Sequence, residues 1–478
     1  MATMIRCYLG TYNLTTALPA TISLNGRPPS AYFAEASSRA NRTPDINLIL
    51  DSSRQTRILN ADSPGQPTEL FWLNRALRGL IGDADGKVPG NTIGLLFADH
   101  YAPDPDMFGL MFTRGFSDGG DIFAKPPRVG AVVFAGAIRE KRKQDTDYAD
   151  QVGFDSIHEL GHIFNLWHVS DPVNLMKVSD PDQVYGPPFS FVKAEADFLS
   201  QCSTSPFVLP GGSDFEDRGD LHVGDDGSAS DLPVGKAVLQ LSIGINQREC
   251  FFFEPIELDI RLSVRQGTRK SYRIPDQIDP GYESFVIWIT DPTGERRRYR
   301  PTQYYCRSTK FRNIGPKSPF ERDITIFGGA GGYTFRKAGL HRVQAVLRLP
   351  QGKPLASNKL EFMLLPSQPR SAHYRSLRTH LTHQDAASLL YYRAAPANGR
   401  GIKKLEDFCR ELPKARASAA CHYALGRVFL AHARVQTRRH WVETYRKCAH
   451  AHLARAVDSQ HLAGHRRVIA ERLLKQST

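Results

Sequence analysis

The stretch His158–His168, HELGHIFNLWH, constrains the N-terminal part of this chain more than any other segment does. In an α-helix, residues four apart lie on one face, so His158 and His162 can direct their imidazole rings at one metal ion. Glu159 follows the first histidine and can contact a water on that ion without binding the ion itself. For His168 to reach the same ion, the helix must stop near residue 165 and the chain must reverse. The stretch therefore predicts a helix, a reversal and a three-histidine metal site.

The residue at the predicted reversal is Asn165. A helix usually reverses through a left-handed residue, ordinarily glycine, and asparagine is the next most tolerant of that conformation. Eight residues beyond His168, the sequence PVNLMKV places Met176 in a predicted tight turn. A methionine near a helix end is by itself more typical of core filling. Met176 gains significance only from its distance to His168.

HELGHIFNLWH followed by NLM resembles the metzincin clan of zinc metallopeptidases, whose motif is HExxHxxGxxH with a downstream methionine turn. The resemblance covers roughly residues 40–205. It implies that His158, His162 and His168 bind Zn2+, that Glu159 is the general acid/base, and that Met176 lies in the turn beneath the zinc. A satisfied histidine cluster without metal is the structural alternative.

The resemblance also implies that an edge strand containing Phe108, Gly109, Leu110 and Met111 pairs with an extended peptide substrate by β-addition. Two positions depart from the family pattern. Asn165 replaces the usual glycine, which can shift the third ligand. Val178 stands where some members have a tyrosine that binds the metal or the oxyanion, and Tyr185 is then the nearest candidate for an oxyanion or pocket role.

Around this motif, the first two hundred residues alternate strand and helix patterns. Apolar runs at 45–51, 91–101 and 128–138 are typical of buried strands. Apolar residues recur at the helical period after Thr68, and again from Asp147 through the histidine motif. We therefore predict a mixed α/β metzincin-like catalytic domain over residues 1–209.

The patterns then change along the chain. Residues 210–235 are rich in Gly, Asp and Ser, which predicts a solvated linker; its carboxylates lack the spacing of an EF-hand calcium loop. From 236 to 366 the apolar period becomes two, as in IELDIRLSV, which predicts an immunoglobulin-like β-sandwich. From 371 to 478, alanine, leucine and arginine dominate, which predicts a basic helical domain. The fold class is thus multidomain: α/β, then β-sandwich, then α-helical.

The charge of the chain is concentrated at its C-terminal end. Residues 371–478 contain 20 Lys and Arg against 7 Asp and Glu, a net of +13, which equals the net charge of the whole chain. This asymmetry favours a separate binding function for residues 371–478. A polyanion or an acidic protein is the predicted partner of this segment. A solvated helical surface is the alternative.

The sequence also indicates where the protein is located and whether its cysteines form disulfides. No apolar run approaches the about 20 residues of a membrane helix, and the first residues lack the layout of a secretory signal. We therefore expect a chain without a membrane span that is cytoplasmic, exported by a non-classical route, or numbered without its leader. The 7 cysteines are scattered and odd in number, which is not typical of a disulfide framework.

These observations favour a zinc-dependent endopeptidase that acts on protein or peptide substrates. The alternative is a catalytically inactive metzincin-like binding protein, which binds a polyanion or an acidic partner through its basic C-terminal domain. Retention of Glu159 argues against that alternative, because a purely structural site needs no base. A metallohydrolase with a non-peptide substrate has the same ligands, and only the predicted substrate strand favours peptides over it.

Overall fold

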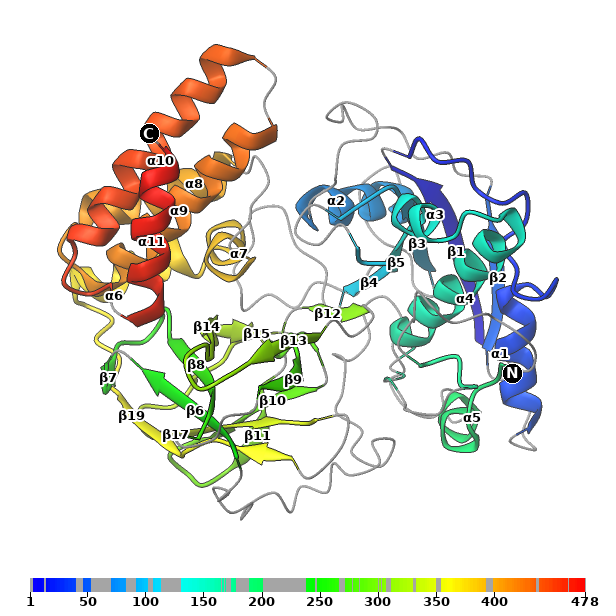
Figure 1. Cartoon of the computed structure of the whole chain (residues 1–478), viewed down its shortest axis with the longest axis horizontal. Helices are drawn as coiled ribbons and strands as arrows, with labels where there is room; N and C mark the ends of the chain where they lie inside the picture. The colour runs from blue at the N-terminus through cyan, green and yellow to red at the C-terminus, as the bar shows by residue number, and fades with distance from the viewer. Residues whose placement is uncertain are drawn as a thin grey trace. The chain divides into compact units, whose positions relative to one another are not determined.

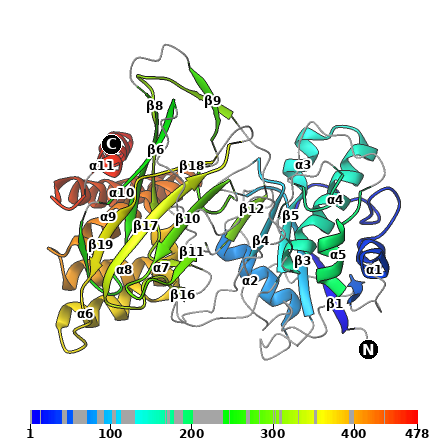
Figure 2. The same ribbon diagram turned by 90° about the horizontal axis from the view of Figure 1, so that it is seen from below.

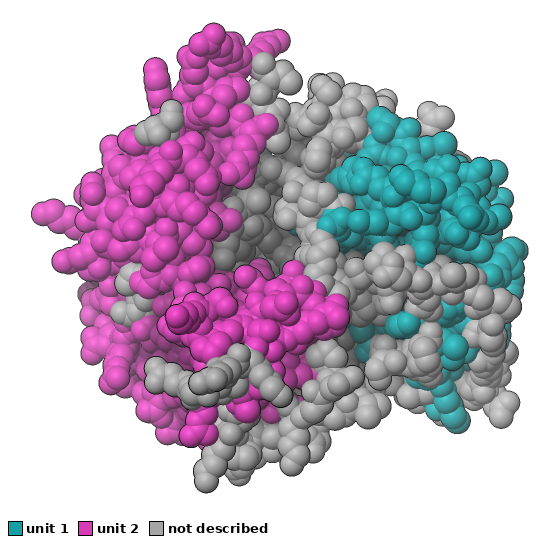
Figure 3. Space-filling view, viewed as in Figure 1, with its two compact units in different colours: residues 1–115, 126–231, 302–309 teal, residues 116–125, 232–301, 310–478 magenta. Residues whose placement is uncertain are grey.

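A computed structural model describes most of the chain as two compact units. The first unit comprises Met1–Gly115, Pro126–Asp231 and Thr302–Thr309, and the second comprises Phe116–Lys125, Leu232–Pro301 and Lys310–Thr478 (Figure 3). The described residues are 3–12, 14–39, 46–52, 70–82, 92–101, 106–112, 130–164, 166, 168, 173–177, 189–200, and 238–477 except 246, 266–270, 277, 283, 300, 302, 307–310, 330–331, 350–353, 393–398, 436–437 and 463. The predicted linker 210–235 lies outside them.

The first unit is built on a mixed six-stranded sheet with the order β12-β4-β5-β3-β1-β2 (Figure 1). Its strands are β1 (Thr3–Thr11), β2 (Ile46–Asp51), β3 (Thr92–Ala98), β4 (Gly109–Phe112), β5 (Gly130–Phe134) and β12 (Gln303–Cys306). The strands β1, β2, β3 and β5 run parallel, and β4 is antiparallel to β5. The strand β1 lies between β2 and β3, and it is an addition to the strands that the apolar runs predict.

Helices cover both faces of this sheet. They are α1 (Pro29–Arg39), α2 (Leu70–Ile81), α3 (Ala135–Lys141), α4 (Asp145–Ile163) and α5 (Lys193–Ser200). Figure 2 shows α2 on one side of the strands and α1, α4 and α5 on the other. Every residue of β3 and β5 is buried, as two covered faces require. The helix α4 packs against β4 and β5 and buries Val152, Ile157 and Leu160, the apolar side that the sequence predicts.

The outer side of β4 carries β12, which runs antiparallel to it with Cys306 opposite Gly109 and Gln303 opposite Phe112. The expectation that Phe108–Met111 belong to an edge strand therefore needs correction, because β12 is the outermost of the described strands on this side of the sheet. Almost two hundred residues separate the two strands, and the apolar pattern of β4 contains no signal for such a long-range pairing. The segment 302–309 belongs to the first unit, whereas the sequence analysis assigned it to the sandwich.

The second unit contains two larger sheets. One has the order β11-β10-β17-β19-β7, with β18 also paired to β17, and the other has the order β14-β8-β6. Their strands are β6 (Leu239–Ile245), β7 (Glu249–Cys250), β8 (Glu257–Val264), β10 (Phe285–Thr290), β11 (Arg296–Arg298), β14 (Phe320–Thr325), β17 (Gly339–Leu347), β18 (Leu355–Ala356) and β19 (Leu360–Leu364). In β8, Leu258, Ile260 and Leu262 are buried and alternate with polar residues. The buried faces of both sheets join one hydrophobic cluster. An immunoglobulin-like topology remains a prediction.

Small two-stranded sheets complete the β-structure of this unit. The strands β9 (Tyr272–Pro275) and β13 (Phe311–Ile314) pair antiparallel, and β15 (Gly328–Gly329) pairs with β16 (Gly332–Tyr333). The chain then continues into helices, which are α6 (Ala372–Ser376), η2 (Leu377–Leu381), α7 (Gln384–Tyr392), α8 (Gly399–Glu411), α9 (Arg416–Val435), α10 (Arg439–Asp458) and α11 (Gly464–Ser477).

These helices share the hydrophobic cluster of the sheets, so the predicted sandwich and helical domains lie in one compact unit. Arg466 of α11 is buried and forms ion pairs with Asp323, at 2.6 Å, and with Glu257. Its guanidinium also donates to Thr325 at 3.0 Å. Part of the C-terminal positive charge is therefore neutralised inside the unit. Polyanion binding by residues 371–478 remains a prediction. Within the described residues, no helix is long and apolar enough to cross a membrane.

Candidate metal centre

The three motif histidines converge on one point. The Nε2 atoms of His158 and His162 are 3.0 Å apart, those of His158 and His168 are 3.0 Å apart, and those of His162 and His168 are 3.1 Å apart. Nitrogen atoms bound to one tetrahedral zinc at 2.0–2.1 Å lie about 3.3 Å apart, close to these separations. His158 and His162 are buried and His168 is half-buried. The three rings could therefore hold a metal ion.

Backbone carbonyls set the orientation of two of these rings. The Nδ1 of His158 donates to the Leu175 carbonyl at 2.9 Å, and the Nδ1 of His162 donates to the Leu166 carbonyl at 2.8 Å. A carbonyl only accepts, so each Nδ1 carries the proton and each neutral ring presents the lone pair of Nε2 to the shared point. Two lone pairs 3.0 Å apart repel each other unless a cation lies between them. The residues present thus fit a metal ion on local chemistry alone.

The chain turns directly after the second ligand. The helix α4 ends at Ile163, and the Leu166 N–H donates to the Gly161 carbonyl at 3.0 Å, a bond typical of a Schellman helix end. This turn brings the Leu166 carbonyl to His162. Asn165 and Tyr185 lie outside the described residues, so their predicted roles remain predictions.

Met176 lies against the helix α4 at Gly161. A Cβ placed on Gly161 would come within 2.3 Å of the Met176 sulfur, so no side chain other than hydrogen fits there without movement. The Met176 N–H donates to Asn174 Oδ1 at 2.5 Å, and Asn174 Nδ2 donates to the buried Glu195 of α5 at 2.8 Å. The same turn supplies the carbonyl that orients His158. This turn therefore contacts both the His158 ring and the helix α4.

Glu159 is fully buried and lies beside β4. A Cβ on Gly109 would come within 2.0 Å of the Glu159 carboxylate, so the glycine permits the strand backbone to pass directly over this carboxyl group. Leu110 and Met111 follow Gly109 in β4 and are fully buried, and Phe108 precedes the strand. The structure therefore brings Glu159 and the predicted substrate strand together, with β12 on the outer side of that strand.

Sequence reasoning missed the residues that support the site. Gly161 stands within the motif, but a glycine in a helix carries no mark of close packing. Asn174 lies two residues before Met176, and its residue type alone does not predict a hydrogen bond to a distant helix. Glu195 gave no signal, because its hydrogen bond to Asn174 joins residues from different elements. Only the structure shows that a buried acid on α5 holds the turn.

Comparisons with known proteins add no family assignment. No protein-family model matches the chain, and no curated protein matches it. Wild-type OgpA from Akkermansia muciniphila aligns with 76% of this chain and 95% of its own, at 14% identity and a TM-score of 0.24. Catalytically inactive OgpA, solved with an O-glycopeptide substrate (glycodrosocin), aligns with 76% and 94%, at 13% identity and a TM-score of 0.23.

The sporulation control protein Spo0M from Bacillus subtilis aligns with 29% of this chain at 11% identity and a TM-score of 0.18, and the match spans about half of Spo0M (53%). TM-scores this low carry no argument about fold or activity. The function proposed below therefore rests on the geometry of the site.

Proposed function

We propose that this protein is a zinc-dependent endopeptidase of the metzincin type, with His158, His162 and His168 as ligands and Glu159 as the general base. The observation that carries the proposal is the convergence of three Nε2 atoms within 3.1 Å, with two of the rings fixed by backbone carbonyls. Hydrogen bonds to the second ring nitrogen are the usual way in which proteins orient histidine ligands of a metal.

Zinc at such a site supplies a Lewis acid for the substrate carbonyl and lowers the pKa of a water to about 7. The chain's own residues supply the proton transfers. Glu159 follows a ligand in the helix, so its carboxylate can take a proton from the attacking water and pass it to the leaving amine. Its burial beneath Gly109 keeps the carboxylate beside the strand proposed to align the substrate.

A peptide substrate is favoured by β4, whose backbone passes over Glu159. Pairing of an extended peptide with a strand aligns its backbone through main-chain hydrogen bonds. In this structure β12 already pairs with β4 in the antiparallel sense. Substrate pairing along Gly109–Phe112 therefore requires β12 to leave β4. The segment 303–306 then competes with the substrate for pairing with β4.

The test compares wild type with Glu159→Gln and His162→Ala, with zinc measured by elemental analysis and cleavage measured on an unfolded protein substrate. Glu159→Gln keeps size and helix, so zinc should remain, while cleavage falls by about 10²–10⁴ or more because the amide cannot accept the proton. The matched control is Glu140→Gln, since Glu140 is in the same unit and its side chain is 67% exposed. This control should cleave like wild type.

Other outcomes separate the alternatives. Wild type that binds zinc but shows no chelator-sensitive cleavage of any protein substrate would favour the inactive binding protein or a non-peptide hydrolase. Wild type that binds no metal would contradict the three-histidine site itself. Equal cleavage by wild type and Glu159→Gln would contradict the role of Glu159 alone.

A further inference from the structure

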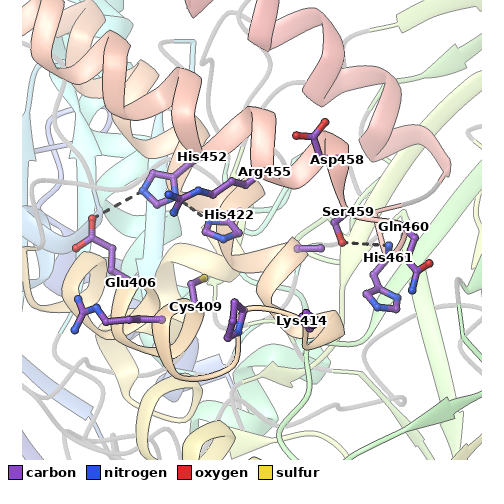
Figure 4. A pocket seen from close by; sticks show the side chains of 13 residues that line it. Glu406, Cys409, Lys414, His422, His452, Arg455, Asp458, Ser459, Gln460 and His461 are labelled. Atoms are coloured by element: carbon purple, nitrogen blue, oxygen red, sulfur yellow. Dashed lines mark hydrogen bonds and ion pairs between the residues drawn. The ribbon is translucent and has the colours of Figure 1, made fainter.

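The helical part of the second unit contains a cavity of about 920 Å³, and its wall is formed by α8, α9, the end of α10 and the connections next to these helices. Pockets of about 300–1,000 Å³ are the usual size for a small-molecule ligand. Figure 4 shows the lining of this cavity, in which polar and charged side chains predominate. The size and the lining together indicate a polar ligand rather than an apolar one.

The chain around this cavity is strongly basic. Residues 412–457 contain nine Lys and Arg against one acidic residue, Glu443, so the local potential is positive. Three cations from different places in the chain line the cavity, namely Arg410 in the last turn of α8, Lys414 in the connection to α9, and Arg455 in the last turn of α10. A concave wall that carries charge of one sign concentrates the electrostatic potential inside it. The cavity therefore favours an anion.

Two of these three cations are not neutralised by the protein itself. Arg410 forms an ion pair of 3.0 Å with Asp407, which does not line the cavity. Among the described residues, no acidic side chain forms an ion pair with Lys414 or Arg455. Nearby, Arg416 pairs at 3.2 Å with a buried glutamate of the same unit, so this cation serves the fold. The charges of Lys414 and Arg455 therefore remain available to a ligand in the cavity.

The other ionisable groups of the lining do not cancel these two charges. An oxygen of Glu406 faces Nε2 of His452 at 3.9 Å, and Figure 4 shows the Asp458 carboxylate pointing away from the ring of His422. The Nδ1 atoms of the buried His422 and of His452 share a hydrogen bond of 2.9 Å. Burial, followed by the charges of His422 and Arg455, lowers the pKa of His452 to about 4, so this ring is neutral at pH 7.

A metal ion does not account for this cavity, although imidazoles line it. Among the described residues, only His158, His162 and His168 bring three ligand atoms within 4.8 Å of one another. The unneutralised charges of Lys414 and Arg455 would also repel a metal ion, whereas they attract an anion.

We propose that this cavity binds a phosphorylated small molecule, whose phosphate groups pair with Lys414 and Arg455. A phosphate group carries about two negative charges at pH 7, which two cations can balance. The planar guanidinium of Arg455 matches two phosphate oxygens through parallel N–H groups, and the ammonium of Lys414 acts as a point charge. The cavity exceeds the size of a phosphate group, so it leaves space for the rest of the molecule. The proposal is independent of the metal centre in the first unit.

The first experiment titrates pyrophosphate into the full-length protein at pH 7 by isothermal calorimetry. Lys414→Gln and Arg455→Gln each remove one exposed charge, so the affinity should fall about fivefold in each variant and about 25-fold in the double variant. Arg446→Gln and Lys447→Gln are the matched controls, because these exposed cations of α10 lie outside the lining. The controls should stay within about twofold of wild type. Any pyrophosphate bound at the metal centre is common to all these variants.

The second experiment separates a small phosphorylated molecule from a polymer. Adenosine triphosphate carries its phosphates on a small molecule, so it should displace pyrophosphate from wild type. A wild type that binds no pyrophosphate at millimolar concentration, or that adenosine triphosphate does not displace, would overturn the proposal. Equal losses in the cavity and control variants, together with tighter binding of a single-stranded oligonucleotide, would also overturn it. The basic charge would then serve a polyanion on the outer surface of α10.

Discussion

Two histidine clusters in this molecule have nearly the same nitrogen separations and different chemistry. In the first unit, Nε2 atoms of His158, His162 and His168 lie 3.0–3.1 Å apart. In the second unit, Nδ1 atoms of His422 and His452 lie 2.9 Å apart. The difference lies in the other nitrogen of each ring. Backbone carbonyls bind Nδ1 of His158 and His162, so both lone pairs face the same point.

Among the described contacts of the second cluster, His452 Nε2 faces Glu406 at 3.9 Å, and one shared proton satisfies the contact between the two rings. Separation alone therefore does not distinguish a metal site from a hydrogen-bonded pair. The number of converging lone pairs, and the acceptors that fix them, decide which cluster attracts a cation.

The largest expected difference is in metal binding. His162→Ala removes one of three ligands, so we expect the bound zinc and the peptidase activity to be lost together. His452→Ala is the matched change in the second cluster and should leave zinc content at the wild-type level. Elemental analysis of both purified variants makes the measurement. Zinc retained by His162→Ala, or lost by His452→Ala, would contradict the claim that the first cluster binds the metal and the second does not.

The next effect concerns the approach of β4 to Glu159. In Gly109→Ala the new methyl group would lie 2.0 Å from the carboxylate, so the carboxylate or the strand must move. A displacement near 1 Å at a catalytic group costs about 100-fold in rate, and we expect such a loss in kcat/KM with zinc still bound. Gly399→Ala is the control, because no atom lies within 4 Å of its added Cβ. Wild-type activity in Gly109→Ala would show that the carboxylate adjusts freely.

The third effect is on the pH dependence of stability. The pKa of His452 is lowered to about 4 by burial and by His422 and Arg455, whereas an unfolded histidine titrates near 6.5. Between these values only the unfolded chain binds the proton, so the free energy of unfolding falls as the pH falls. We expect about 2 kcal/mol of this loss between pH 7 and pH 5 to come from His452. Denaturant titrations of His452→Gln should show a correspondingly flatter profile, and an identical profile would contradict a neutral buried ring.

The smallest effect tests access to the metal centre, which β12 limits in the first unit. Replacing Tyr304 and Tyr305 with proline removes both of their N–H groups, one of which faces β4 because consecutive N–H groups of an antiparallel strand point to opposite sides, and so weakens the pairing. If β12 competes with substrate, cleavage should rise about tenfold, the equivalent of about one backbone hydrogen bond. Replacing the same residues with alanine keeps the N–H groups and is the control. Unchanged cleavage in the proline variant would show that substrate does not use this side of β4.

Local patterns predicted much of what surrounds the candidate site. The helical period over α4 and the burial of its apolar side follow from the spacing of Val152, Ile157 and Leu160. The alternation in β8 likewise predicts which residues enter the core of the second unit. Such patterns are readable because each depends on backbone geometry over a few residues. The strand β1 escaped prediction, although it lies between β2 and β3 in the sheet.

What the sequence by itself determined is the donor set: two histidines four apart on one helix face, a glutamate beside the first, and a third histidine beyond the helix end. Helix geometry makes the first two ligands neighbours wherever the helix lies. Only the tertiary structure decided that Leu175 orients His158, that Gly109 passes over Glu159, and that β12 pairs with β4. These contacts join residues from different elements, and their spacing along the chain does not encode them, because they depend on how whole elements pack.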